Sequence, residues 1–406
     1  MEIVQIITLL MGLSGFSVGT NPNAPNADQA LAYAVPDADF VVHFDAGAVI
    51  PNNYKVLTNL PNQPAIKASP ELAKMVRKAI AEVDGFKGVA VTTVGIDPTK
   101  DISDATAFIQ WVPQQDPNIL VAVHGKFNVA SIDKVAKQLG KSSVKTGGGA
   151  WVDTGNGNAV ALTKSGVLLA GTSTLVKDRM GDTWKAPAVS SMQNVADVIN
   201  AKPVFAVSVQ LSQAARTEIT GKADKDQNFV VDLVKRHKFA AFAVYKDGIG
   251  WTWFDSTKAG LDNMQQVSEG TVDLLRAAQI APRGFAKIVM GALDSYKGTN
   301  KQIDDLIKHK ADLWKIVETY TGDGQFKSSI TADPKTFKLS VRLTGKSLSE
   351  VVPLGGMLPG LGAWFALSKD AGSPPPTMQM PSPTPLPPPP PPGAKKGNAG
   401  NAGKHP

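Results

Sequence analysis

Cysteine is absent from this chain of 406 residues. Its absence excludes disulfide bonds, thiolate zinc sites, cysteine nucleophiles and a lipid-modified cysteine near the N-terminus. A cysteine-free composition suits an exported bacterial protein, although many cytosolic proteins share it. The composition is therefore compatible with an exported protein and with a cytosolic one.

A dense cluster of charge of one sign is also missing. The formal net charge is +7, and four lysines against one aspartate after residue 368 contribute +3 of it. The densest basic run, residues 235–238, is typical of the C-terminal end of a helix. We expect no nucleic-acid partner, because such a partner would require a dense basic surface.

Spacing patterns for metal or phosphate binding are likewise missing. The histidines of the body are His43, His124, His237 and His309. No two of them are three or four residues apart, the separation of metal ligands on a helix. Residues 145–150 are glycine-rich but lack the order of a phosphate-binding loop, so we interpret them as a turn. We therefore expect a non-enzymatic protein with no catalytic residues, metal or cofactor.

Two groups of polar residues nevertheless permit a catalytic alternative. His43 and Asp45 are two residues apart, which would place both on one face of a strand and could orient a general base. A structural role is favoured for this pair, and a hydrolase site assembled from His43, Asp45 and His124 is the alternative. Residues 304, 305 and 312 are acidic, and beside Lys308 they are typical of surface ion pairs on a helix.

The N-terminal residues resemble an export signal. Residues 3–13 are mostly apolar, and Ser17-Val18-Gly19 offers small residues at the positions that a signal peptidase reads. No Lys or Arg precedes the apolar run, which such signals usually have. We predict a signal peptide at residues 1–19 and a linker at 20–33; a retained anchor and a packed first helix are the alternatives.

Two modules are predicted to follow, at residues 34–181 and 203–350, with a linker and short helix at 182–202. In the first, residues 40–44 form a strand, Ser69 and Pro70 begin a helix that Gly85 ends, and residues 89–94 form a strand. Further strands at 105–112 and 119–123, a helix capped by Asn128, and an antiparallel meander complete it.

The second module is predicted to repeat this order. Strands at 204–209, 239–245 and 249–254 accompany helices at 229–236 and 261–279, and another long helix starts at Thr299. Residues 326–331 and 337–343 form the last hairpin, with alternating apolar and polar residues in its second strand. The fold class is α+β: two divergent copies of one module, whose antiparallel sheets have helices covering one face.

Two stretches carry a resemblance to known proteins. Val35-Pro36-Asp37-Ala38-Asp39-Phe40-Val41-Val42 resembles the start of exported bacterial envelope proteins of unknown function, in which a turn leads into such a strand. Residues 165–172 are similar to a strand of those proteins that a short helix follows. The resemblance implies an envelope or secreted location and a repeated module, and it supplies no catalytic residues.

Candidate binding segments are aromatic or proline-rich. Trp251 and Trp253 are two residues apart on a strand, so both rings face one side and could form a stacking surface; packing in the core is the alternative. Residues 351–367 carry no charge, and their Gly and Pro make a spanning helix unfavourable. We predict that this segment closes onto the body, with Trp364 and Phe365 as interface contacts; a membrane contact is the alternative.

The C-terminal tail, residues 368–406, is predicted to be disordered. Its unbroken proline run forms an extended rod suited to docking or spacing. The run consists of Pro387, Pro388, Pro389, Pro390, Pro391 and Pro392. The hypothesis is an exported binding or scaffolding protein, located in the periplasm, on the cell surface or secreted, with a protein or envelope partner at the tail. A cytosolic adaptor with a docking tail is a further alternative.

Overall fold

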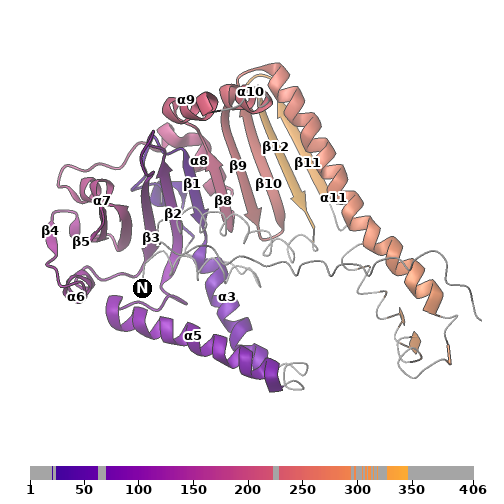
Figure 1. Ribbon diagram of the computed structural model, residues 1–406, viewed down its shortest axis with the longest axis horizontal. Coiled ribbons are helices and arrows are strands. Elements are labelled where there is room, and N and C mark those ends of the chain that lie inside the picture. Colours follow the sequence, from indigo (N-terminus) through magenta and orange to yellow (C-terminus); the bar gives the residue numbers. More distant parts are fainter. Residues whose placement is uncertain are drawn as a thin grey trace, which may run out of the picture. The chain divides into compact units, whose positions relative to one another are not determined.

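The computed structural model describes residue 21, residues 24–62, 70–222, 228–293 and 327–345, and a few single positions between 297 and 318. These residues form an α+β structure with one large antiparallel sheet (Figure 1). The predicted α+β class is therefore confirmed. The signal peptide, the closing segment with Trp364 and Phe365, the proline run and most of the helix from Thr299 lie outside the described residues.

The sheet has twelve strands in the order β11-β12-β10-β9-β8-β1-β2-β3-β7-β6-β5-β4. The strands are β1 (Phe40–Phe44), β2 (Ile102–Gln110), β3 (Asn118–Gly125), β4 (Val144–Thr146), β5 (Gly149–Gly155), β6 (Asn158–Thr163), β7 (Val167–Thr172), β8 (Phe205–Val209), β9 (His237–Tyr245), β10 (Gly248–Asp255), β11 (Lys327–Asp333) and β12 (Lys338–Thr344). Every neighbouring pair runs antiparallel.

The helices connect these strands or precede them. They are α2 (Ala27–Ala30), α3 (Ala46–Asn59), η2 (Leu60–Asn62), α5 (Pro70–Val94), α6 (Ser131–Gln138), α7 (Ser173–Met180), η3 (Val189–Met192), α8 (Gln193–Asn200), α9 (Gln213–Lys222), α10 (Asn228–Arg236) and α11 (Lys258–Leu293). Most of them follow the predicted apolar patterns, but α2, α3 and α9 were not predicted. α2 lies within residues 20–33, which we predicted as a linker, and its Ala27 and Ala30 are buried in the core.

Strand order is the same on both sides of the β1–β8 pair. β1, β2 and β3 follow one another, and β7 then pairs with β3; β8, β9 and β10 follow one another, and β12 then pairs with β10. The two central strands pair antiparallel, with Val42 opposite Val207 at the middle of their register. One sheet therefore replaces the separate sheets that we predicted, because β8 pairs with the free edge of β1.

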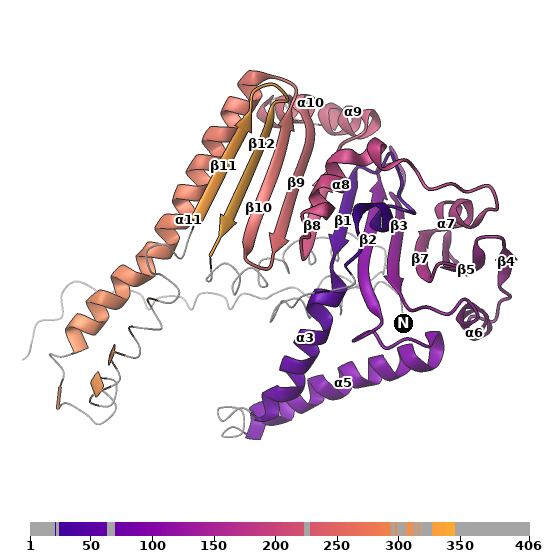
Figure 2. The same cartoon turned by 180° about the vertical axis from the view of Figure 1, so that it is seen from behind.

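Helices cover both faces of this sheet, seen from opposite sides in Figures 1 and 2. The face that carries Val42 and Val207, here face A, packs against α3, α6 and α11. The opposite face, face B, carries His43 and Ser208 and packs against α2, α7 and α8. The expectation that helices cover one face is wrong, since both faces of most strands are apolar and need cover.

Helix α5 is longer than predicted. It starts at Pro70 as expected, but it continues through Gly85 and Gly88 to Val94, where we predicted a strand. No atom lies within 4 Å of a Cβ built on either glycine, so both face open space. An isolated glycine costs a helix only about 1 kcal/mol, whereas a left-handed residue ends it. Gly95, with φ +76°, takes that conformation and ends α5.

Candidate functional site

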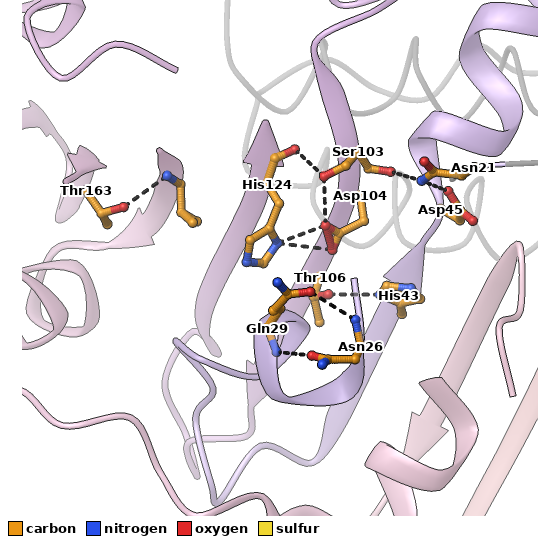
Figure 3. Close-up of polar contacts among 11 residues, drawn as sticks. Asn21, Asn26, Gln29, His43, Asp45, Ser103, Asp104, Thr106, His124 and Thr163 are labelled. Carbon is orange, nitrogen blue, oxygen red and sulfur yellow. Dashed lines mark hydrogen bonds and ion pairs between the residues drawn. The ribbon is translucent and has the colours of Figure 1, made fainter. Parts of the chain in front are cut away.

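A polar cluster lies on face B of the first three strands (Figure 3). His43 of β1 places Nδ1 3.0 Å from Oγ1 of Thr106 on β2. His124 of β3 places Nδ1 2.9 and 3.1 Å from the two carboxylate oxygens of Asp104, which is fully buried on β2. The register of neighbouring strands thus brings His43 and His124 to either side of β2.

Burial controls the protonation of this cluster. It lowers the pKa of His43 to about 4; the charge of Asp104 opposes this, and that of His124 adds to it. His43 is therefore neutral near pH 7 and acts there as a hydrogen-bonding partner of Thr106. The His43–Thr106 and His124–Asp104 contacts each join neighbouring strands, which fits a structural role.

Asp45 does not orient His43 in the structure. It lies just after β1, where Oδ1 accepts the backbone N–H of Ala48 at 3.0 Å and caps the start of α3. The same oxygen accepts Nδ2 of Asn21 at 2.7 Å. Burial raises the pKa of Asp45, and these hydrogen bonds oppose the rise. These contacts engage Asp45 away from His43, because β1 ends at Phe44 and the strand alternation stops there.

The two tryptophans of β10 share face A, as their spacing predicted. Trp251 lies opposite Val341 and Trp253 opposite Leu339 on β12. Nε1 of Trp251 donates to Oγ of Ser268 on α11 at 2.9 Å. The Trp253 ring lies 4.7 Å from the His237 ring. Both indoles are half-buried beside α11, and their role as a stacking surface stays a prediction.

A groove that sequence reasoning missed lies on face B of β9 to β12. Its volume is about 240 Å³, and α8 contributes Val198 to one side. Four serine and threonine residues line it: Thr252, Ser329, Thr331 and Ser340. We call these four residues and the space above them the hydroxyl groove. The polar residues in the alternating pattern of β12 indicated that one side of this strand faces solvent. They did not indicate that β9, β10 and β11 complete a hollow on that side.

The hydroxyls of the groove are available to a ligand. Within the described part of the chain, none of the four side chains forms a hydrogen bond with another residue. Ser329 and Thr331 are exposed, while Thr252 and Ser340 are half-buried on the floor. Hydroxyls both donate and accept, so the groove offers hydrogen bonds of either polarity.

Cations lie on aromatic rings at both ends of the groove. The guanidinium carbon of Arg342 lies 3.3 Å from the centre of the Tyr245 ring, and Arg342 also pairs with Asp247. At the other end, Nζ of Lys338 lies 5.0 Å from the centre of the Phe254 ring. Burial raises the pKa of Tyr245, and Arg342 opposes the rise. Arg342 lines the groove itself, whereas Lys338 and Phe254 lie beyond its lining residues.

Gly250 lets the floor of the groove lie close to β12. A Cβ added there would be 2.8 Å from the carbonyl oxygen of Val341 and 3.4 Å from the Tyr245 ring. A side chain would therefore push β10 from β12 and displace Tyr245. The shape of the hollow therefore depends on glycine at this position.

No three His, Asp or Glu side chains of the described chain gather as a metal site would require. No helix within the described ranges combines the length and apolar character needed to cross a bilayer.

Comparisons with known proteins give limited information. No family model matches the chain, and no curated protein matches it. Crystal form I of TP0453, from Treponema, is similar with a TM-score of 0.32 and 8% identity over 82% of this chain and 98% of that one. Crystal form III gives a TM-score of 0.28 and 7% identity over 80% and 97%. Likeness at this level carries no inference about fold or function.

Proposed function

We propose that this chain is a non-enzymatic ligand-binding protein of the bacterial cell envelope, and that the hydroxyl groove is its binding site. The observation that carries the proposal is a hollow of about 240 Å³ whose four hydroxyls have no partner within the described residues. Binding sites are concave and present a few convergent polar groups in this way.

The chemistry of the groove selects a class of ligand. Free hydroxyls suit a ligand that itself carries several hydroxyls, and Arg342 can take a carboxylate through two parallel N–H donors. Asp247 uses part of that guanidinium, but a guanidinium carries five donors. A sugar acid combines both features, so it is the proposed ligand class.

The N-terminal sequence supports the envelope location. An apolar run, then Ser17-Val18-Gly19, then an Asn/Pro/Ala-rich linker is the order of a cleaved signal and a mature start. The proline run at residues 387–392 is proposed to space the body from a partner in the envelope or to dock onto one.

The repeated strand order supports a duplicated module. Both halves run strand, helices, hairpin, helix and a further hairpin or meander that returns to the third strand. Divergent duplication of one ancestral module would produce this order, and the β1–β8 pair would be the joint between the copies.

The binding proposal is tested by calorimetry with glucuronate and with glucose, which lacks the carboxylate. We expect glucuronate to bind and Ser340→Ala with Thr252→Val to weaken binding at least tenfold. Thr271→Ala is the matched control, because its exposed hydroxyl lies on α11. No binding of either sugar, or equal binding by the groove variant, would overturn the site.

The location is tested separately by mass spectrometry of the mature N-terminus. We expect a chain that starts close to Thr20 in the envelope fraction. A chain that starts at Met1 in the cytosol would overturn the envelope part of the proposal and leave the groove untouched.

A further inference from the structure

Face A has an apolar region that the described helices leave half-open. It comprises Phe40, Val42, Ile109, Val121, Val207 and Phe242, which lie on five adjacent strands. All six side chains are only partly buried. By contrast, Phe44 and Phe205 at the end next to α3 are 3% and 7% exposed. We call the six residues the apolar strip.

The strip cannot recognise a polar ligand. Its six side chains carry no hydrogen-bonding or charged group, so any occupant must present an apolar surface to them. Four of the six, Val42, Val121, Val207 and Phe242, already pack against the buried cluster of face A, so an occupant would extend that core. The remaining question is which occupant the chain offers.

The geometry points to an occupant within the same chain: we propose that residues 351–362 cover the apolar strip. This stretch carries no charge and holds six apolar side chains: Val351, Val352, Leu354, Met357, Leu358 and Leu361. Pro353 and Pro359 lack an N–H, so fewer backbone donors need a partner where the stretch touches the strip. The stretch lies outside the described residues, and the inference rests on the strip and on the sequence.

The end of β12 brings this stretch within reach. β12 ends at Thr344, and β10 and β9 separate it from β8, which carries Val207. Three strand steps span about 14 Å. The residues between Gly345 and Val351 extend to about 20 Å. The register places Thr344 level with the end of the strip that adjoins Phe205.

Two other occupants are distinguishable from this one. A second copy of the chain would cover the strip from outside, and an acyl-chain ligand would fill it without the stretch. The chain's own stretch is favoured because it is tethered next to the strip and matches its lack of charge.

The lack of cysteine in the natural chain makes a cross-linking test specific. The pair Val207→Cys with Leu358→Cys is oxidised in the full chain, and the control pair is Thr331→Cys with Leu358→Cys, because Thr331 is exposed on face B. We expect an intramolecular disulfide from the first pair and at least tenfold less from the control. Equal yields, or disulfides between chains only, would overturn the proposal, the latter in favour of a second copy.

A truncation gives an independent readout. A chain that ends at Glu350 is compared with one that ends at Gly362, using the fluorescence of anilinonaphthalene sulfonate and the uptake of oleate. We expect the shorter chain to bind at least threefold more of both probes, and a peptide of residues 351–362 to reverse this. Equal uptake by both chains would overturn the proposal. Glucuronate binding lies on the opposite face and should be unchanged, so this test and that of the groove fail separately.

Single substitutions refine the result. Leu358→Asp in the full chain should raise probe binding at least threefold, because a carboxylate is unfavourable against the strip. Ser349→Asp adds the same charge just before the stretch and should leave probe binding unchanged. An equal rise in both variants would contradict docking through the apolar side chains.

Discussion

The two halves of the sheet place different residues at equivalent positions. Since strand order matches about the β1–β8 pair, positions of β8, β9, β10, β12 and β11 have counterparts in β1, β2, β3, β7 and β6, whereas β5 and β4 have none. The hydroxyl residues Thr252, Ser329, Thr331 and Ser340 are the counterparts of Ala122, Ala159, Ala161 and Leu169. These last four are fully buried.

The cover above each position explains this difference. In the N-terminal half α2 and α7 lie on face B, and Val176 and Met180 of α7 pack in the same cluster as Leu169. In the C-terminal half α8 reaches β9 but leaves β10 to β12 to the groove. The comparison teaches that one strand framework holds a core in one half and an open hollow in the other, according to the helix above it.

The largest expected effect comes from truncating Leu169, the buried counterpart of Ser340. Leu169→Ala should lower the free energy of unfolding by about 4 kcal/mol, because it leaves a cavity under α7. Ser340→Ala should change it by no more than about 0.5 kcal/mol. Urea unfolding measures both. Similar losses in the two variants would show that the halves do not differ in cover.

The pH dependence of stability compares the buried histidine of each half. Burial lowers the pKa of both His43 and His237 to about 4. Since the unfolded pKa is higher, at about 6.5, the unfolded chain binds more protons, and stability falls as pH drops from about 6.5 to about 4. Once the pH is well below 4, the lowered pKa of each histidine corresponds to a loss of about 3 kcal/mol in the free energy of unfolding.

Replacing either histidine should remove the part of the acid-induced stability loss that this histidine causes. The slope of unfolding free energy against pH is compared for the natural chain, His43→Asn and His237→Asn. The raised pKa of Asp45 changes the stability with pH in the opposite direction. It does so equally in all three proteins, so it cancels when their slopes are compared. A slope unchanged in His237→Asn alone would mean that only the N-terminal half holds a neutral histidine.

Reciprocal exchange of a hydroxyl sharpens the comparison further. Ala161→Thr should cost about 2 kcal/mol, because it places a bulkier, unpaired hydroxyl under α7. Thr331→Ala, its counterpart, should leave stability within about 0.5 kcal/mol yet weaken glucuronate binding. Thermal unfolding and calorimetry together provide the readout. A tolerated Ala161→Thr would contradict tight cover of the N-terminal half.

The smallest expected effect concerns charge at the end of the groove. Arg342→Gln should weaken glucuronate binding about tenfold, or about 1.4 kcal/mol, because a neutral amide replaces a charged pair of donors. Stability should change by less than about 1 kcal/mol, since the partner Asp247 is exposed. Glucose binding serves as the control and should be unaffected. An equal loss for both sugars would remove the carboxylate from the proposed ligand.

Local patterns predicted most of the strands, since alternation is a property of a few neighbouring residues. Leu339, Val341 and Leu343 are buried as their spacing indicated. Residues 89–94 were assigned wrongly because their β-branched residues favour strands, whereas continuation of α5 decides their structure. Intrinsic preference is a weak guide when an adjoining helix can extend.

The candidate site was less predictable because it depends on long-range register. Thr331 lies level with Thr252 across β12 only through pairings that join residues far apart in sequence. The contact of His43 with Thr106 likewise depends on the register of β1 and β2, while that of Asp45 depends on where β1 ends. Neither the register nor the end of a strand can be read from a single segment.

The β1–β8 pair also sets an order of events during synthesis. The free edge of β1 finds its partner only after Val209 has been made, 165 residues after Phe44. At about 5–20 residues per second, the ribosome needs roughly 8–33 s to supply them. During that time β1 presents unpaired backbone groups, which are a template for aggregation. A chain that is exported unfolded would spend this interval without the β1–β8 pair. Factors that keep such a chain unfolded should therefore protect the N-terminal half from aggregation more than the C-terminal half.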